Sequence, residues 1–239
     1  MSDPKKDVMF YALVLGIVSA AALLSAYVYH GSAASAAPSL GRAESFAVLG
    51  GSTVTNTGST KITGDVGLSS PGVSVTGFPP GTIARGKQHV GDPAANAAQR
   101  DAQRAYDALA GMVCNTPLTG QDLGGKTLSP GVYCFTSSAQ LTGQLVLDAR
   151  GNRNAIWVFQ IASTLTTAPD AAVVMGDGGQ AGDVFWQVGS GATFGTGTAF
   201  AGNVLAYSSI TLNTGARLSG RALARAGVTM DGNVMHAPR

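Results

Sequence analysis

The chain has 239 residues, of which 45% are hydrophobic and 12% are charged, and its formal net charge at pH 7 is +2. So large an apolar fraction excludes an intrinsically disordered chain, and so small a net charge argues against nucleic acid as a partner. The length fits one globular domain of about 200 residues behind a short N-terminal segment.

The N-terminal segment contains a long apolar stretch. The first seven residues are polar and include two lysines, and residues 8–29 then run without a charge. As a helix this stretch would measure about 33 Å, which is long enough to cross a bilayer. The small-residue run 31–38 follows, and within it Ala34 and Ala36 are spaced as at signal-peptidase sites. Residues 1–36 are therefore expected to be a signal peptide or a membrane anchor, and both alternatives stay open.

Either alternative places the rest of the chain outside the cytoplasm. The lysines keep the N-terminus inside, so residues 37–239 would be secreted or held on the outer side of the cytoplasmic membrane. Export also bears on Cys114 and Cys134, the two cysteines of the chain. In an exported protein such a pair favours a disulfide, whereas a zinc site needs more ligands than the pair offers.

The first part of the exported region predicts strands and then a helix. Residues 40–68 read as the first coils, and 69–86 is rich in Pro-Gly turns. Asp92 and Pro93 are typical of a helix start, and Gly111 is typical of a helix end. Between them an apolar stripe has helical spacing. Its members are Ala95, Ala98, Ala102, Ala105 and Leu109.

The helix 93–110 is expected to lie along a stack of strands. It would measure about 27 Å, the height of about five to six strands spaced about 4.8 Å apart. Its alanines permit close approach to a flat sheet. The predicted fold is therefore mainly β: a β-solenoid of roughly six coils, with one long α-helix along its axis and an apolar helix before it.

The region 184–235 repeats every 18 residues. Thr193, Thr211 and Thr229 recur at that interval, each directly before a large apolar residue. The apolar residues form three columns: Phe194, Leu212 and Met230; Trp186, Val204 and Ala222; Phe200 and Leu218. A fixed period with inward apolar columns predicts a solenoid whose coils bury their faces against their neighbours. The period is too short for two packed helices, and abundant Gly and β-branched residues favour strands joined by tight corners.

Looser copies of the repeat lie upstream, at 53–56, 140–142 and 164–167. Because alternate residues of a strand share a face, one residue of each copy is expected to point inward: Val54, Leu141, Leu165, Phe194, Leu212 and Met230. The outward residues are expected to form two files of mostly short hydroxyl side chains on one flat face. The outward pairs are Thr53/Thr55, Gln140/Thr142, Thr164/Thr166, Thr193/Gly195, Thr211/Asn213 and Thr229/Asp231.

A series of segments in fixed order covers nearly all of 40–236. The segments are 46–49, 52–58, 62–67, 75–81, 118–125, 128–133, 158–161, 184–189, 210–215 and 220–224. This series resembles the single-domain β-solenoid ice-binding (antifreeze) proteins of cold-adapted microbes. The resemblance implies that 37–239 is a right-handed, triangular, discontinuous β-solenoid with the helix alongside. It also implies that a flat solenoid face meets ice.

Some members of that family carry a Thr-Ala/Gly-x-Thr/Asn motif on this face. Residues 57–60 match the whole motif, whereas segments beginning at Thr142, Thr167, Thr196 and Thr214 match its first half, with Asp170 and Arg217 as departures. The motif and the outward files together define the candidate ice-contact residues. They are Thr53, Thr55, Thr57, Thr142, Thr164, Thr166, Thr193, Thr196, Thr211, Asn213, Thr214 and Thr229.

The expected function is ice binding outside the cell, by a monomer that needs no cofactor. The expected partners are the ice surface and, if residues 8–29 remain, a membrane. The alternative is a cell-surface adhesin or a carbohydrate-binding β-solenoid. A polysaccharide-cleaving enzyme would need clustered carboxylates, and no shared column contains Asp65, Asp122, Asp148, Asp177 and Asp183. No catalytic triad, metal or phosphate motif is present in the sequence either, so we do not expect an enzyme.

Overall fold

The computed structural model describes residues 37–72 and 74–238. The predictions for residues 1–36, among them the apolar stretch 8–29, lie outside the described residues. Within the described ranges, no helix is both long and apolar enough to cross a membrane.

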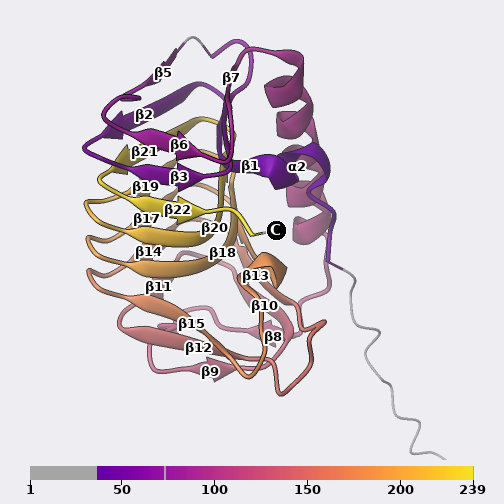
Figure 1. Ribbon diagram of the computed structural model, residues 1–239. Coiled ribbons are helices and arrows are strands. Elements are labelled where there is room, and N and C mark those ends of the chain that lie inside the picture. The colour runs from indigo at the N-terminus through magenta and orange to yellow at the C-terminus, as the bar shows by residue number, and fades with distance from the viewer. Residues whose placement is uncertain (1–36, 73, 239) are drawn as a thin grey trace, which may run out of the picture. The chain divides into compact units, whose positions relative to one another are not determined.

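The described chain is built mainly from short parallel strands, with one long helix (Figure 1). Its elements are η1 (Gly41–Ser45), β1 (Phe46–Gly50), β2 (Thr53–Thr57), β3 (Lys61–Thr63), β4 (Asp65–Leu68), β5 (Ser74–Thr76), β6 (Thr82–Ala84), β7 (Gln88–Val90), α2 (Pro93–Ala110), β8 (Thr116–Pro117), β9 (Thr127–Leu128), β10 (Gly131–Phe135), β11 (Ala139–Leu141), β12 (Gln144–Asp148), β13 (Trp157–Ile161), β14 (Leu165–Thr167), β15 (Ala172–Gly176), η2 (Ala181–Asp183), β16 (Val184–Val188), β17 (Ala192–Phe194), β18 (Ala199–Ala206), β19 (Ile210–Leu212), β20 (Arg217–Ala224), β21 (Gly227–Asp231) and β22 (Val234–His236).

The strands form three faces around a common interior, which we call faces a, b and c. Face b is a seven-stranded sheet in the order β11-β14-β17-β19-β21-β2-β5. Face a contains β8, β10, β13, β16, the second halves of β18 and β20, β1, β4 and β7. Face c contains β9, β12, β15, the first halves of β18 and β20, β22, β3 and β6.

The long strands β18 and β20 turn the edge between faces c and a. Gly202 lies at this bend in β18 with a φ of 121°, a conformation that favours glycine. A Cβ atom at this position would lie 2.6 Å from Nε1 of Trp186. The bend and the close packing of the tryptophan therefore both require glycine.

The order of the coils in space differs from their order in the chain. The first coil stacks on the last one, because β1 pairs with β20, β2 with β21, and β3 with β22. Strands β4, β5 and β6 stack on the outer side of this first coil. The chain then passes along α2 to the other end of the stack, where β8 pairs with β10 (Figure 1). The solenoid is therefore discontinuous, as predicted, and face b has seven levels where roughly six were expected.

Large apolar side chains fill the interior. Phe159 stacks on Trp186 with ring centroids 3.8 Å apart, and the ring centroid of Phe200 lies 4.8 Å from that of Trp186. Strand register aligns the predicted columns that contain Trp186 and Phe200. The residues predicted to point inward from the face b strands are all buried: Val54, Leu141, Leu165, Phe194, Leu212 and Met230.

Helix α2 lies along face a, as its length and alanine stripe predicted (Figure 1). The side chain of Asp92 accepts a hydrogen bond from the N–H of Ala95 at 2.8 Å and so caps the helix start. All five residues of the predicted stripe are buried. They pack against outward apolar residues of face a: Val132, Val158, Phe185, Leu205 and Leu223.

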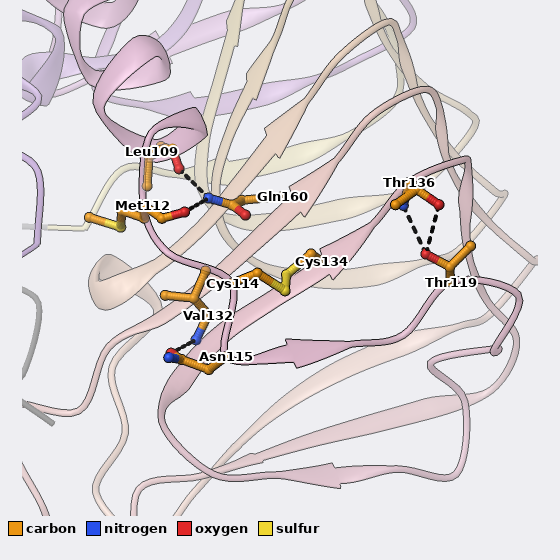
Figure 2. The surroundings of a disulfide bond; sticks show 9 residues. All are labelled: Leu109, Met112, Cys114, Asn115, Thr119, Val132, Cys134, Thr136 and Gln160. Atoms are coloured by element: carbon orange, nitrogen blue, oxygen red, sulfur yellow. Dashed lines mark hydrogen bonds between the residues drawn. A yellow bond between two sulfur atoms is a disulfide. The ribbon is translucent and has the colours of Figure 1, made fainter. Parts of the chain in front are cut away.

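A disulfide joins Cys114, just after the helix, to Cys134 on β10, as predicted (Figure 2). Beside it, Nε2 of Gln160 donates to the carbonyl oxygens of Leu109 at 2.7 Å and Met112 at 2.8 Å. These bonds satisfy carbonyl groups that the end of a helix leaves without intrahelical partners. The disulfide and the glutamine together hold the end of α2 against face a.

Candidate functional site

Face b carries a continuous row of exposed and half-exposed side chains, which we call the central file. Strand register aligns its members across the sheet in the order Gln140, Thr166, Thr193, Thr211, Thr229, Thr55 and Thr76. Six adjacent strands, spaced about 4.8 Å apart, thus each contribute a threonine. In the strands from β11 to β2, the residues on both sides of the file member are buried, which fixes its outward direction.

Two shorter rows flank the central file. On one side, Thr53 is level with Gly227 and Ser74, and the hydroxyl of Thr164 donates to Ser138 Oγ at 2.8 Å. On the other side, Thr57 of β2 is level with Asp231 of β21, and Asn213 follows β19 just as Asp231 follows Met230. The residues of these rows are small or short and polar, so no long side chain projects from the sheet on either side of the central file.

The register corrects the two predicted files. The sequence pattern places Thr53 and Thr164 level with Thr193, but Thr55 and Thr166 occupy those positions. The same shift of two residues occurs on face a. Phe46 precedes Thr53 by seven residues, as Trp186 precedes Thr193, yet Val48 and not Phe46 is level with Ala222 of the Trp186 column. A shift by two leaves every side chain on its own face. The hydrophobic pattern therefore cannot reveal it.

The motif residues at the corner between faces b and c are not all exposed. Thr60, the last residue of the full match, is buried, and its hydroxyl oxygen accepts from the N–H of Asn233 at 3.0 Å. Thr167 is also buried and shares a hydrogen bond of 2.8 Å with the hydroxyl of Thr198. These hydroxyl groups stabilise the corner from inside. The corner candidates that stay exposed are Thr57, Thr142, Thr196 and Thr214.

One carboxylate lies at the same corner. Asp231 is the only ionisable residue in the strands of face b, all of which belong to the described part of the chain. Its oxygens accept hydrogen bonds from the hydroxyls of Thr214 and Thr57, the latter at 2.9 Å. These bonds, Thr214 first, hold the pKa of Asp231 below its ordinary value, so it is charged at neutral pH. Both threonine hydrogens are used, so their hydroxyls offer solvent only acceptor sites.

The other two faces offer different surfaces. Face a is covered by α2. Face c exposes Arg217 and Lys61, which are aligned on strands separated only by that of Val234. It also exposes His236 and the apolar Val174, which is 39% exposed. Face b is thus the open face with the lowest charge and the most regular side chains.

Face b presents a regular array of short side chains and not a cluster of ionisable groups. In the ranges 37–72 and 74–238, no three His, Cys, Asp or Glu side chains are grouped so that they could hold a metal ion. At the helix start, His89 Nδ1 lies 2.7 Å from Oδ2 of Asp92, and its Nε2 lies 4.0 Å from Oδ2 of Asp65. Asp92 already caps the helix, so this cluster has a structural role.

Comparisons with known proteins agree with this geometry. Residues 48–236 match the sequence model of the family described as Ice-binding-like. An ice-binding protein of Nostoc sp. (strain HG1) is 53% identical over 202 residues, which cover 84% of this chain and 72% of the relative. The crystal structure of an ice-binding protein from the Antarctic ascomycete Antarctomyces psychrotrophicus superimposes with a TM-score of 0.81 at 40% identity, over 84% of this chain and 98% of that one. An ice-binding protein from an Antarctic biological consortium gives a TM-score of 0.80 at 51% identity, over 83% and 90% of the two chains.

Proposed function

This chain belongs to the ice-binding-like family, and on that basis we propose that it binds ice through face b and limits ice growth or recrystallisation outside the cell. The observation that carries the choice of face is the central file, in which six adjacent strands each present a threonine at the same level. Proteins similar to this one along most of its length are named ice-binding proteins, and none of those compared above is named as an enzyme.

Threonine suits an ice contact because it carries a methyl group and a hydroxyl group on a stiff stem. Branching at Cβ leaves few χ1 states, so little rotamer entropy is lost when the side chain is held against a surface. The methyl group orders nearby water, and the hydroxyl group hydrogen-bonds that water at small entropic cost. A row of such side chains can therefore hold a layer of water in place.

Strand pairing supplies a regular repeat for that water layer. Neighbouring file members are about 4.8 Å apart across the sheet, and alternate residues of one strand are about 6.6 Å apart along it. The central file and its flanking rows thus form a two-dimensional array. Water held on this array can join the hydrogen-bonded lattice of an ice crystal, and protein adsorbed in this way opposes further growth of that surface.

The scarcity of charge on face b also favours contact with ice. Charged groups hold their own hydration shells, and removing that water costs free energy. The central file contains no charged residue, and Asp231 lies at its border with both neighbouring hydroxyls turned toward it. Face c, with Arg217 and Lys61 exposed, is less suited to the same contact.

The test is ice-affinity partitioning of purified 37–239, in which a seed crystal grows slowly in the protein solution. We expect the protein to be enriched in the ice fraction relative to an unrelated protein of similar size. A cell-surface adhesin or carbohydrate-binding module would stay in the liquid. Recovery of the protein from the liquid alone would therefore exclude ice binding and favour that alternative.

We also propose that the domain acts outside the cell as a monomer, either secreted or anchored. The uncharged stretch 8–29, the lysines before it and the disulfide Cys114–Cys134 support export. Intact mass analysis distinguishes the two forms. A secreted protein that begins at Ala37 indicates cleavage, whereas the complete chain in the membrane fraction indicates an anchor.

A further inference from the structure

Asp231, the last residue of β21, connects three successive coils at the corner between faces b and c. Its strand lies between β2 and β19 (Figure 1). Oδ1 accepts a hydrogen bond from the hydroxyl of Thr57 on β2 at 2.9 Å. Oδ2 accepts one from the hydroxyl of Thr214, which follows β19. Both threonines are exposed candidate ice-contact residues, so one carboxylate bonds two side chains of the proposed contact surface.

The direction of these hydrogen bonds follows from the chemistry of the groups. Hydrogen bonds from Thr214 and Thr57 hold the pKa of Asp231 below its ordinary value, so the carboxylate is ionised at neutral pH. An ionised carboxylate only accepts, so each threonine donates its single hydroxyl hydrogen. The Thr57 hydroxyl has a second acceptor at 3.3 Å, the carbonyl oxygen of Met230, which also belongs to the protein. Both hydroxyl hydrogens are therefore directed away from solvent.

Asp231 is itself held in place by buried groups. Its backbone N–H donates to Oδ1 of Asn233 at 2.6 Å. Asn233 is completely buried, and its Nδ2 donates to the carbonyl oxygens of Asn213 at 2.8 Å and Ala216 at 3.1 Å. Glycine at position 58 leaves room beside the carboxylate, since a Cβ atom there would lie 3.2 Å from Oδ1 of Asp231. The carboxylate is thus fixed through its backbone and remains half-exposed to water.

We propose that Asp231 is a positioning residue of the ice-contact surface: it turns the hydroxyl hydrogens of Thr57 and Thr214 toward itself, so that this corner of face b accepts hydrogen bonds from water and donates none. This inference rests on the proposed function of face b. The accepting groups are the carboxylate and the two threonine oxygens. Water bound to them has to point a hydrogen atom at the protein.

Fixed hydroxyl directions reduce the number of arrangements open to the bound water. A freely rotating hydroxyl donates to one water molecule and accepts from another, so the water beside it has no single orientation. Water at this corner instead presents its oxygen and its second hydrogen to the next layer. Ordering that precedes adsorption lowers the entropy lost when ice is bound. The carboxylate keeps its water as part of this layer, so its charge is not stripped of hydration.

Neutron diffraction from crystals of the protein in heavy water locates the hydroxyl deuterium atoms directly. We expect those of Thr57 and Thr214 to point at the carboxylate of Asp231. A deuterium atom of either hydroxyl that points to solvent would overturn the inference. This measurement needs neither ice nor a variant, so its result depends on neither the proposed function nor the folding of a variant.

Asp231→Asn tests the role of this residue in ice binding. Asparagine keeps the shape of the side chain but brings an NH2 donor, so one threonine has to turn its hydrogen to solvent. Asp177→Asn is the matched control, because it removes the same charge at an exposed turn position whose φ of 43° asparagine also tolerates. We expect Asp231→Asn, folded at the temperature of the assay, to lose its enrichment in ice severalfold. Asp177→Asn should partition like the unmodified protein.

The double variant Thr57→Val/Thr214→Val distinguishes positioning from a direct contact of the carboxylate with ice. Valine keeps the shape of threonine but has no hydroxyl to be turned, and the central file still provides a measurable enrichment in ice. We expect Asp231→Asn to have little further effect in this background, because coupled residues are not additive. An undiminished further loss would show that Asp231 does not act through the two threonines.

Equal or greater enrichment of folded Asp231→Asn, compared with the unmodified protein, would also overturn the inference. Recovery of the unmodified protein from the liquid alone would instead contradict the proposed function of face b. The two failures are therefore distinguishable, because the first requires an unmodified protein that does enter the ice fraction.

Discussion

The hydroxyl of Thr55 donates a hydrogen bond to the hydroxyl of Thr229 over 3.3 Å, although 174 residues separate the two in the chain. This bond crosses the junction of β2 with β21, where the first coil stacks on the last. The central file therefore continues across a joint that has no covalent connection. Its regularity there depends on how firmly the two ends of the chain are packed together.

Arg221 stabilises this joint from the edge between faces a and c, so we expect Arg221→Met to destabilise the domain. The change removes donors from the carbonyl oxygens of Glu44 and Pro238 and from Asn203. Each buried polar group left without a partner costs about 1–3 kcal/mol. A loss of about 2 kcal/mol would lower the Tm of a domain of this size by about 4–8 °C, which calorimetry can measure.

Arg217→Met is the matched control. Arg217 lies on the same strand but is exposed on face c, and exposed substitutions usually change stability by less than about 0.5 kcal/mol. Equal melting temperatures for the two variants would show that Arg221 does not hold the chain ends.

We expect reduction of the disulfide Cys114–Cys134 to lower stability by about 3 kcal/mol, because the closed loop spans 20 positions. The expected fall in Tm is about 6–12 °C, measured with and without a phosphine reductant. The double variant Cys114→Ala/Cys134→Ala should melt like the reduced protein and should not respond to the reductant. A reductant-sensitive double variant would point to a different cause of the loss.

The helix contact with face a predicts a strong effect of charge at Ala102, which is 7% exposed in the buried stripe. Ala102→Glu places a carboxylate against apolar side chains, which costs several kcal/mol or forces the helix away. Thermal melting of 37–239 is the measurement. The control is Ala108→Glu, on the exposed side of the same helix. Similar melting of the two variants would mean that the stripe is not packed on the sheet.

The sequence predicted whether each side chain points inward or outward better than it predicted the register in which the strands pair. Local alternation decides whether a residue such as Leu212 or Thr211 points inward or outward, so these directions could be predicted from the repeat. The register of each repeat copy against its neighbour depends on loop lengths and on which coil the copy pairs with. The stacking of β2 on β21 is such a long-range pairing, and no local pattern distinguishes Thr55 from Thr53 as the partner of Thr229.

Inward hydroxyl groups were the other feature that the sequence could not reveal. Thr60 and Thr167 match a surface motif, yet both are buried because they bond to groups at the corners. Thr119 lies in a turn-rich stretch without an evident role, but its oxygen accepts from the N–H of Thr136 at 2.8 Å (Figure 2). Threonine is small enough and polar enough to serve on either side of a strand, so its type alone does not assign its place.

The proposed ice contact is tested most directly at Thr211. This residue is in the middle of the central file, between Thr193 and Thr229, and its neighbours Ile210 and Leu212 are buried. A larger side chain here projects from the flat sheet without entering the core.

We therefore expect the melting temperature of Thr211→Tyr to stay close to that of the unmodified protein, with a stability change within about 0.5 kcal/mol. We also expect this variant to lose most of its enrichment in ice, because the tyrosine ring keeps the neighbouring threonines from the crystal. Ser219→Tyr is the matched control: Ser219 lies on the face c half of β20, directly before the bend at Gly220, and is exposed, so this variant should partition like the unmodified protein. Both variants are compared by ice-affinity partitioning after their folding is checked by melting. If folded Thr211→Tyr adsorbs fully while Ser219→Tyr does not, ice binds face c and not face b.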